Sequence, residues 1–413
     1  MKISCLKVYK LIVLLVVILN LGILNINYNK SITWLYLSSI ISIATFFVFL
    51  LNKHHIKMNS EYVLYLTLII VLFFIQLFRC IQQFMPELSV KEAVQRYNGV
   101  FLLLLTYPIL EVLKKDKRDF LKQVVIIGYI YLFFRIVVWF MFNFKGINIA
   151  PGYFSGQSGT AWTRQLGNLN LSRLSGTFLD NLLIVYSTVK VLNSDLKKDK
   201  ILYGLFLVLW FMYTTIVYQS RMQAVIGIFT VLFLIYVKNK FSKNKVLNYL
   251  LLLLLLFAII MSYYDNIVGL LQSFSTTDSM YGGSTAARLN GIEYFYGLWR
   301  NSNVLLGTGF LPDQIKLTYY TFYVVDYGFF MNLVEFGIIG SFIYLFPFIK
   351  GLIVGVKVIR NKLITDNMIF CQIGLTFYMT LGMVLYNYYW MDYITIMPFF
   401  ISLVLYSANT LRG

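Results

Sequence analysis

Arginine is the residue type in this sequence best suited to binding an anion. Lysine and arginine fall into two alternating sets of polar segments, and one set holds nineteen lysines but only Arg118, Arg360 and Arg412. The other set holds four lysines and seven arginines: Arg79, Arg96, Arg164, Arg173, Arg221, Arg288 and Arg300. A guanidinium group can bind phosphate or carboxylate with two parallel hydrogen bonds. Pairing with nearby Asp or Glu is the alternative for each arginine alone, but seven together favour an anion site.

Two of these arginines are predicted to have restricted positions. Arg221 ends a short turn at 218–221 between two apolar stretches, so two helices would anchor it, with snorkelling to the membrane surface as the alternative role. Residues 285–299 show a helical pattern, with Ser284 or Thr285 as N-cap. Arg288 is expected in the first turn, where free amides and the helix dipole favour an anion. The apolar side of this helix is predicted to carry Leu289, Ile292, Phe295 and Trp299.

Composition places these segments in a polytopic membrane protein. The nine hydrophobic residue types make up 59% of the 413 residues, against roughly 45–50% in soluble proteins. Charged residues are only 13%. With 36 Phe and 32 Tyr, a soluble fold of this length lacks the interior to bury its apolar surface. The net charge of +18 lies in short runs between apolar stretches, which indicates membrane orientation rather than nucleic-acid binding.

Apolar stretches of about 20 residues are expected to cross the membrane. The side with 22 Lys and Arg, against 11 on the other, is predicted to be cytoplasmic and to hold both termini. We therefore expect an all-α fold, a single membrane domain over 1–413 in the cytoplasmic (inner) membrane. Two long external loops are expected: 145–175, without regular structure, and 265–325, which carries a helix on the membrane surface. The twelve predicted spans are 9–27, 31–51, 61–83, 98–113, 121–144, 176–192, 201–217, 222–237, 246–264, 326–349, 367–388 and 393–410.

Cysteine and histidine exclude several kinds of site. Cys5, Cys80 and Cys371 share no close spacing, so neither a disulfide framework nor a thiolate metal site is expected. The two histidines, His54 and His55, are adjacent in one predicted cytoplasmic segment, which argues against a multi-histidine metal centre. No external carboxylates have the spacing of metal ligands, so we expect no metal and no cofactor.

Two charges are expected inside the membrane. Arg135 and Glu335 each lie about nine residues from the outer end of a predicted span, roughly 13 Å deep at 1.5 Å per residue. They are predicted to form a buried pair that supports a site above them. Buried charges are also typical of transporters. A lipid-linked oligosaccharide flippase or other transporter is therefore the alternative class, although no internal repeat is evident.

Four segments, in order along the chain, resemble those of the O-antigen polymerase and O-antigen ligase superfamily. Residues 172–181 (SRLSGTFLDN) are similar to a family segment that enters a span, although the family's proline before Asn181 is missing. Ser220-Arg221 is similar to a short Ser-Arg element. Residues 288–310, which end in Gly-Thr-Gly-Phe, and residues 326–340, which include Glu335, are similar to two further elements. Together these segments extend over about 40% of the chain.

The resemblance implies an integral membrane glycosyltransferase of the C-type architecture. Its expected substrate is an oligosaccharide repeat linked through pyrophosphate to undecaprenol at the outer leaflet of membrane lipid. A ligase transfers the glycan to lipid A-core, whereas a polymerase transfers it to another lipid-linked repeat. Family ligases carry a histidine before the span that corresponds to 326–349, and this chain has none there, so a polymerase is favoured over a ligase. A chain-length-regulating copolymerase and a flippase are the expected protein partners.

The resemblance also implies roles for individual residues. Arg173, Arg221 and Arg288 are expected to bind the pyrophosphate and to stabilise its departure. Asp326 is the first candidate for orienting the attacking hydroxyl group, with capping of the following span as its alternative role. The secondary candidates are Asp180, Glu293, Glu335 and Asp278.

The predicted topology can be tested by labelling cysteines in intact cells. In a variant without the native cysteines, a cysteine at Ser275 should react with an impermeant thiol reagent, because 265–325 is expected outside. A cysteine at Ser242, in a predicted cytoplasmic segment, should react only after the cells are opened. The reverse pattern would contradict the orientation and every site assignment that depends on it.

Overall fold

The computed structural model describes residues 5–25, 31–52, 56–83, 89–116, 120–154, 163–166, 169–240, 282–317 and 321–412, and most of them are helical. The elements up to residue 154 are α1 (Cys5–Asn20), α2 (Ser31–Leu51), α3 (Ser60–Gln83), α4 (Val90–Tyr97), the 3-10 helix η1 (Asn98–Leu105), α5 (Thr106–Lys115), α6 (Phe120–Lys145) and α7 (Pro151–Phe154). The next are β1 (Thr163–Leu166), β2 (Leu169–Ser172), α8 (Asp180–Asn193), α9 (Lys197–Met212), the π-helical turn η2 (Tyr213–Val217) and α10 (Arg221–Asn239). The last are α13 (Gly282–Arg300), β3 (Gln314–Lys316), β4 (Thr321–Tyr323), η3 (Val324–Tyr327), α14 (Phe330–Arg360), η4 (Leu363–Thr365), α15 (Asn367–Gly382), η5 (Ile394–Ile396) and α16 (Met397–Thr410).

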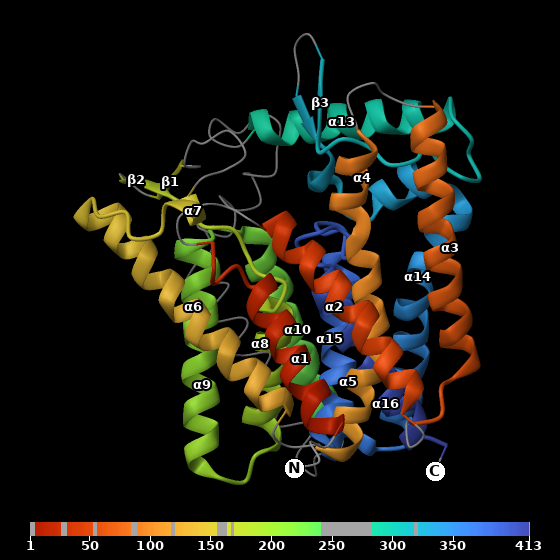
Figure 1. Ribbon diagram of the computed structural model, residues 1–413. Helices are drawn as coiled ribbons and strands as arrows, with labels where there is room; N and C mark the ends of the chain where they lie inside the picture. Colours follow the sequence, from red (N-terminus) through yellow and green to blue (C-terminus); the bar gives the residue numbers. More distant parts are fainter. Residues whose placement is uncertain are drawn as a thin grey trace.

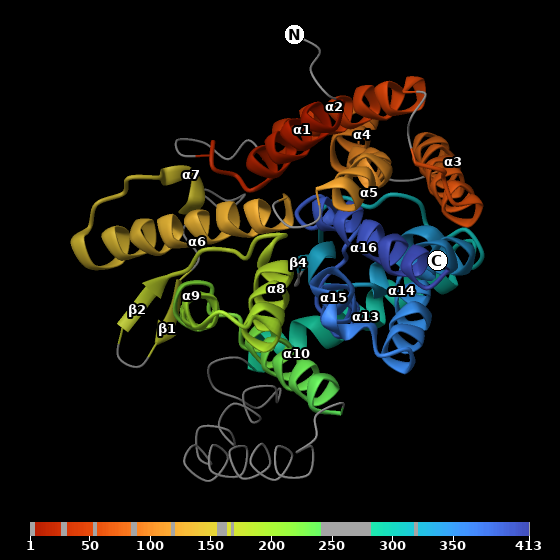
Figure 2. The same ribbon diagram turned by 90° about the horizontal axis from the view of Figure 1, so that it is seen from below.

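Most of the helices run side by side, and α13 lies across one end of the bundle, nearly perpendicular to them (Figure 1). We call this the α13 end. The start of α1 and the end of α16 both lie at the opposite end. Seen along the helices, α14, α15 and α16 group beside α5, whereas α6, α8 and α9 lie on the other side (Figure 2). Helix α15 contacts α8 and α10 as well as α14 and α16, so it joins the two groups.

Seven of the described helical segments are long and apolar enough to cross a membrane, which is consistent with the prediction of a polytopic membrane protein. They are Ser31–Leu51, Ser60–Arg79, Val90–Lys115, Phe120–Lys145, Lys197–Val217, Arg221–Asn239 and Phe330–Arg360. Each overlaps one of the predicted spans. Four more predicted spans fall on the shorter helices α1, α8, α15 and α16. The predicted span 246–264 lies outside the described residues, so the number twelve stays a prediction.

The segment Val90–Lys115 is the most enclosed of the seven. Within its most apolar 18 residues, 89% are buried inside the protein, whereas the corresponding share for Ser31–Leu51 is 33%. A capping box starts it: the Ser89 side chain accepts from the Glu92 amide, and the Glu92 carboxylate accepts from the Ser89 amide. The segment is therefore a core element that other helices surround rather than one that faces lipid.

Helix α14 is interrupted near its α13 end, at Gly337. The segment 304–309 fills the break and satisfies the backbone groups that the interruption frees. The amides of Thr308 and Gly309 donate to the carbonyls of Val334 and Glu335 at 2.8 and 2.9 Å. In the other direction, the amides of Ile338 and Ile339 donate to the carbonyls of Val304 and Leu305 at 3.2 and 3.1 Å. Each backbone N–H or C=O group left without a hydrogen bond inside a membrane costs roughly several kcal/mol. Because these hydrogen bonds cross the break, the protein avoids most of that cost.

Two side chains of α3 hold the segment that enters this break. The Arg79 guanidinium donates to the carbonyls of Leu306 and Gly307 at 2.6 and 2.7 Å. The Gln76 amide donates to Leu306 as well, at 2.7 Å. Arg79 is one of the seven arginines that the sequence assigned to an anion site. The structure gives it a backbone-holding role instead.

The two predicted external loops contain more regular structure than expected. Residues 145–175 include α7 and the antiparallel hairpin β1–β2, so the expectation of a loop without regular structure is wrong for these parts. In 265–325, the predicted helix is confirmed as α13, and a second hairpin, β3–β4, follows it. Only Phe295 of the four predicted apolar residues is fully buried; Leu289 and Ile292 are exposed.

The close approach of two backbones at Gly307 and Gly337 predicts a strong effect of alanine at either position. Both glycines have positive φ, 73° and 63°, and a Cβ on one would overlap the backbone beside the other. Gly337→Ala should therefore lower the free energy of unfolding by roughly 2–4 kcal/mol. Thermal unfolding in detergent, followed by size-exclusion fluorescence, measures the effect.

Gly355→Ala is the matched control on the same helix. A Cβ at Gly355 would meet no atom closer than 3.8 Å, so this variant should unfold at or above the parent temperature. Equal unfolding temperatures for Gly337→Ala and Gly355→Ala would show that the backbone contact does not stabilise the fold.

Candidate functional site

Arg173 follows β2 on a segment whose backbone is held on both sides. On α6, the Asn143 side chain accepts from the Ser172 amide at 2.7 Å, and Trp139 Nε1 donates to the Ser172 carbonyl at 2.6 Å. On the other side, the Leu174 amide donates to the carbonyl of Val217 in η2 at 3.1 Å. Arg173 is thus fixed against the turn between α9 and α10, which carries Arg221.

That turn is as short as the sequence predicted. The π-helical turn η2 ends at Val217, Gln219 has a positive φ of 55°, and α10 begins at Arg221. The Ser220 amide donates back to the carbonyl of Thr214 at 3.1 Å, which closes the turn. Arg221 is therefore anchored by two helices, as expected.

Arg288 lies on α13 but not where the sequence placed it. The helix begins at Gly282 rather than beside Thr285, so Arg288 is its seventh residue and lies in the second turn. The free amides of the helix N-terminus are therefore not beside it, and that part of the prediction is wrong. Pattern reasoning missed the earlier start because Gly282 and Gly283 are poor helix formers.

Asp326 is brought to α13 by η3. The neighbouring residue Tyr327 packs directly on Gly291, where a Cβ would collide with the tyrosine hydroxyl group, and its ring lies 5.0 Å from that of Phe295. Burial raises the pKa of Tyr327 to about 12, with a further increase from Asp326 and an opposing effect of Arg288. Asp326 itself is exposed. Since Asp326 and Arg288 both act on Tyr327, the structure brings these two charges into one place.

Arg173 belongs to the same cluster. Burial lowers the pKa of its guanidinium group below the ordinary value, and the positive charge of Arg288 adds to this effect. Asp326 opposes the change, together with Tyr218 and Tyr393. Two other predicted site residues, Arg288 and Asp326, therefore lie close enough to Arg173 to act on its charge, although the three come from separate segments. We call these three residues the arginine cluster.

Tyrosines connect the cluster to the turn that carries Arg221. The side chain of Tyr218 lies close to those of Tyr386 and Tyr393. Tyr386 in turn donates to Gln223 on α10 at 3.0 Å. Arg221 follows Tyr218 by three residues, at the start of the helix that carries Gln223.

Asp392 is a candidate that sequence reasoning missed. It precedes Tyr393 in the connection between α15 and α16, and solvent reaches part of its side chain. The protein atoms crowded around its carboxyl group raise its pKa to about 6, and the negative charge of Asp313 adds to the shift. Asp313 is paired with Arg96 at 3.0 Å. The sequence does contain a signal: Asp392 lies two residues after Trp390, in the predicted external turn between the last two spans. Orientation, however, is predicted from Lys and Arg alone.

Asp180 has a structural role at the first residue of α8. Its carboxylate accepts from the Thr177 amide at 2.9 Å and from Gln223 Nε2 at 3.1 Å. Its backbone carbonyl accepts from Trp210 Nε1 at 2.8 Å. Asp180 is fully enclosed by these contacts, so it supports the turns that carry Arg173 and Arg221 rather than reaching a substrate.

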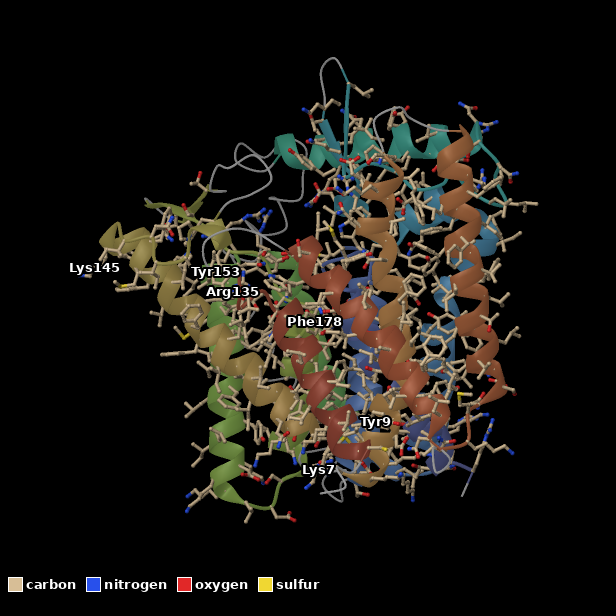
Figure 3. All side chains as sticks on the ribbon, in the orientation of Figure 1. Lys7, Tyr9, Arg135, Lys145, Tyr153 and Phe178 are labelled. Atoms are coloured by element: carbon tan, nitrogen blue, oxygen red, sulfur yellow. The ribbon has the colours of Figure 1, made fainter. Side chains whose placement is uncertain are left out.

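Glu335 and Arg135 do not form the predicted buried pair. Glu335 lies at the break in α14, where its carboxylate accepts from the Tyr97 hydroxyl and from the Leu311 amide. Arg135 lies among tyrosines instead, with the rings of Tyr131, Tyr153 and Tyr213 at 5.6, 5.9 and 5.5 Å from its guanidinium carbon. Arg135 and Tyr153 can be followed in Figure 3. Span boundaries predicted that Arg135 and Glu335 lie at the same depth in the membrane, but depth alone does not determine whether two residues lie beside each other in the membrane plane.

The other two secondary candidates lie elsewhere. Glu293 is exposed on α13 and lines a surface groove with Asn290 and Tyr294. Asp278 lies outside the described residues. Among the residues that the structure describes, no three His, Cys, Asp or Glu side chains come together as possible metal ligands.

No protein-family model matches this sequence, and no curated protein is significantly similar to it. The resemblance to the O-antigen polymerase and ligase superfamily therefore depends on the four short segments alone. Two of those segments meet in the structure, 304–309 on 334–339, whereas 172–176 contacts Tyr213 and Val217, just before Ser220-Arg221.

Proposed function

We propose that the protein polymerises undecaprenyl-pyrophosphate-linked oligosaccharide repeats at the outer face of the cytoplasmic membrane. A hydroxyl group of one repeat attacks the anomeric carbon of another. The bond from that carbon to the pyrophosphate oxygen breaks, the lipid pyrophosphate leaves, and the hydroxyl proton passes to a carboxylate. The product is a chain of O-antigen, capsular polysaccharide or exopolysaccharide. Twelve spans with both termini in the cytoplasm belong to the same proposal.

The arginine cluster is the observation that carries this proposal. Arg173 and Arg288 are two cations that lie within electrostatic range of each other, with Asp326 in the same place. Pyrophosphate carries several negative charges, and two or three guanidinium groups can bind its oxygens bidentately without a metal. Burial around Arg173 strengthens such contacts because water screens them less.

Arg221 adds a cation at an unusual place. The N-terminus of a helix repels positive charge through the helix dipole, so stability of α10 does not account for an arginine as its first residue. A bound anion would interact favourably with both the guanidinium group and the dipole. The position of Arg221 is therefore the position expected of a ligand-binding residue.

In this proposal, one carboxylate positions the arginines and a second accepts the hydroxyl proton. Asp326 lies beside Arg173 and Arg288 and positions their guanidinium groups. Asp392, whose pKa is about 6, is the better proton acceptor because the carboxylate of a weaker acid is the stronger base. This assignment moves the role of base from Asp326, the first candidate from the sequence, to Asp392.

The break in α14 gives the transporter alternative no support. Transporters use the free ends of interrupted helices to bind substrates and ions. Here the amides of Thr308, Gly309, Ile338 and Ile339 and their partner carbonyls are already paired across the break. The interruption therefore offers a ligand few free groups.

The proposal predicts that lysine cannot replace the arginines of the site. Arg221→Lys and Arg288→Lys keep the charge but lose the bidentate geometry. Each should lower the polymerisation rate about tenfold to a hundredfold, since a charge-assisted hydrogen bond contributes roughly 1.5–3 kcal/mol. The measurement is the ladder of oligomers formed by purified protein from a lipid-pyrophosphate repeat.

Arg300→Lys is the control, because Arg300 is exposed at the other end of α13. It should polymerise at the parent rate, with all three variants present in the membrane at equal amounts. If Arg221→Lys and Arg288→Lys polymerise at the parent rate, these two arginines do not bind the pyrophosphate.

The pKa of Asp392 predicts the pH dependence of the reaction. Its carboxyl group is mostly neutral below about pH 6 and mostly ionised above it, because the protein atoms around this partly solvent-exposed group, and Asp313, raise the pKa. If the ionised form accepts the proton, the rate should rise with pH through about 6. Asp392→Asn should lower the rate and abolish this rise. The charged and titratable groups near it are Asp313 with its partner Arg96, and Tyr393.

Asp326→Asn is the matched comparison for this experiment. It should weaken binding of the lipid-linked repeat but keep the rise in rate near pH 6. A pH rise that survives in Asp392→Asn and disappears in Asp326→Asn would return the role of base to Asp326.

A further inference from the structure

A groove of about 560 Å³ lies on α13, between this helix and the β3–β4 hairpin. It belongs to the α13 end of the bundle, where helix and hairpin lie side by side (Figure 1). Its volume falls within the roughly 300–1,000 Å³ that small-molecule sites occupy. The arginine cluster does not line it, so it is a separate feature of the same end.

Helical spacing creates the groove. Asn290, Tyr294, Gly297 and Asn301 recur every three or four residues and therefore lie along one side of α13. Gly297 leaves this side open, because a Cβ there would meet no atom within 4 Å. The hairpin closes the other side with Phe322 of β4, whose ring lies 5.4 Å from that of Tyr294.

The lining has the chemistry that recognises sugars. The half-buried ring of Tyr294, supported from below by the buried Phe322, can pack on the apolar face of a sugar ring. The amides of Asn290 and Asn301 both donate and accept hydrogen bonds, as hydroxyl groups do, and Glu293 accepts them. Among the described residues, no lysine or arginine lines the groove, so it does not suit phosphate, and Leu298 and Leu317 complete its apolar surface.

Arg288 and the groove lie on different sides of the same helix. Arg288 shares a side with Phe295, which packs on Tyr327, and Tyr294 lies six residues further along. At 1.5 Å per residue this is about 9 Å along the helix axis. A glycan of a few sugar residues can span that distance around α13.

We infer that this groove binds neutral sugar residues of the glycan while its pyrophosphate end lies at the arginine cluster. The inference depends on the proposed function for the identity of the glycan. It assigns to Tyr294, Phe322 and the polar residues beside them a role in holding the chain. It also places Glu293 in saccharide binding rather than in proton transfer.

The test uses an oligosaccharide that lacks both lipid and pyrophosphate. Two or three repeat units are released by mild hydrolysis from the envelope polysaccharide of the cell that makes the protein. Binding to the full-length protein in nanodiscs is measured by saturation-transfer NMR. The parent protein should bind this probe. Gly297→Phe should lower its affinity at least about tenfold, because the new ring would occupy the groove from a position where a Cβ meets no atom within 4 Å.

Matched variants separate the groove from general effects. Gly204→Phe makes the same change on α9, where a Cβ also meets no atom within 4 Å, and should bind like the parent. Tyr294→Ala should weaken binding by up to about tenfold, whereas Tyr296→Ala, a tyrosine outside the groove, should not. Equal binding by Gly297→Phe and Gly204→Phe would overturn the inference, as would no binding by the parent.

A failure of the proposed function can be distinguished from a failure of the groove inference. The probe has no pyrophosphate, so Arg288→Lys should bind it at the parent level while losing polymerisation. If Arg288→Lys polymerises at the parent rate, the pyrophosphate site is wrong, but the binding results for Gly297→Phe still decide the groove.

Discussion

The backbone contact between Gly307 and Gly337 sets the geometry of the whole α13 end. Only two residues without side chains allow 304–309 to enter the break in α14 and pair with both of its sides. The contact fixes where the chain leaves α13 and where it returns to α14. Between these points lie the β3–β4 hairpin and η3, which carry one wall of the groove and Asp326. Arg79 and Gln76 hold the same segment from α3, so the contact is supported from a third direction.

The candidate site is assembled from segments with different degrees of support. Arg173 and Arg221 are held by hydrogen bonds to α6 and to the π-helical turn η2, within the bundle. Arg288 lies on α13, which contacts the bundle mainly through Phe295, Tyr327 and the start of α14. A site with one firmly held side and one side on a peripheral helix suits a substrate that is large, enters from the membrane and must leave again.

Much of this organisation could be predicted from the sequence, for physical reasons that also explain the failures. Apolar length identified the membrane helices, and helical periodicity identified α13. The break in α14 was not predicted, because Gly337 lies within a mostly apolar predicted span and its partner segment is about 30 residues away. The Arg135–Glu335 pair failed because span boundaries give depth but not lateral position. Asp392 was missed because charge counting for topology uses only basic residues.

The enclosure of Val90–Lys115 has a consequence for how the protein is made. Protein surrounds this segment on most sides, yet one of its partners lies far along the chain: the Ser402 hydroxyl of α16 donates to the Thr106 carbonyl at 2.7 Å. During translation the segment therefore enters the bilayer about 300 residues before the helix that covers it exists. Chains that stop before α16 keep that surface uncovered. The core of the bundle thus closes only after α16 has been made, and folding intermediates in the membrane must persist with an incomplete interior until then.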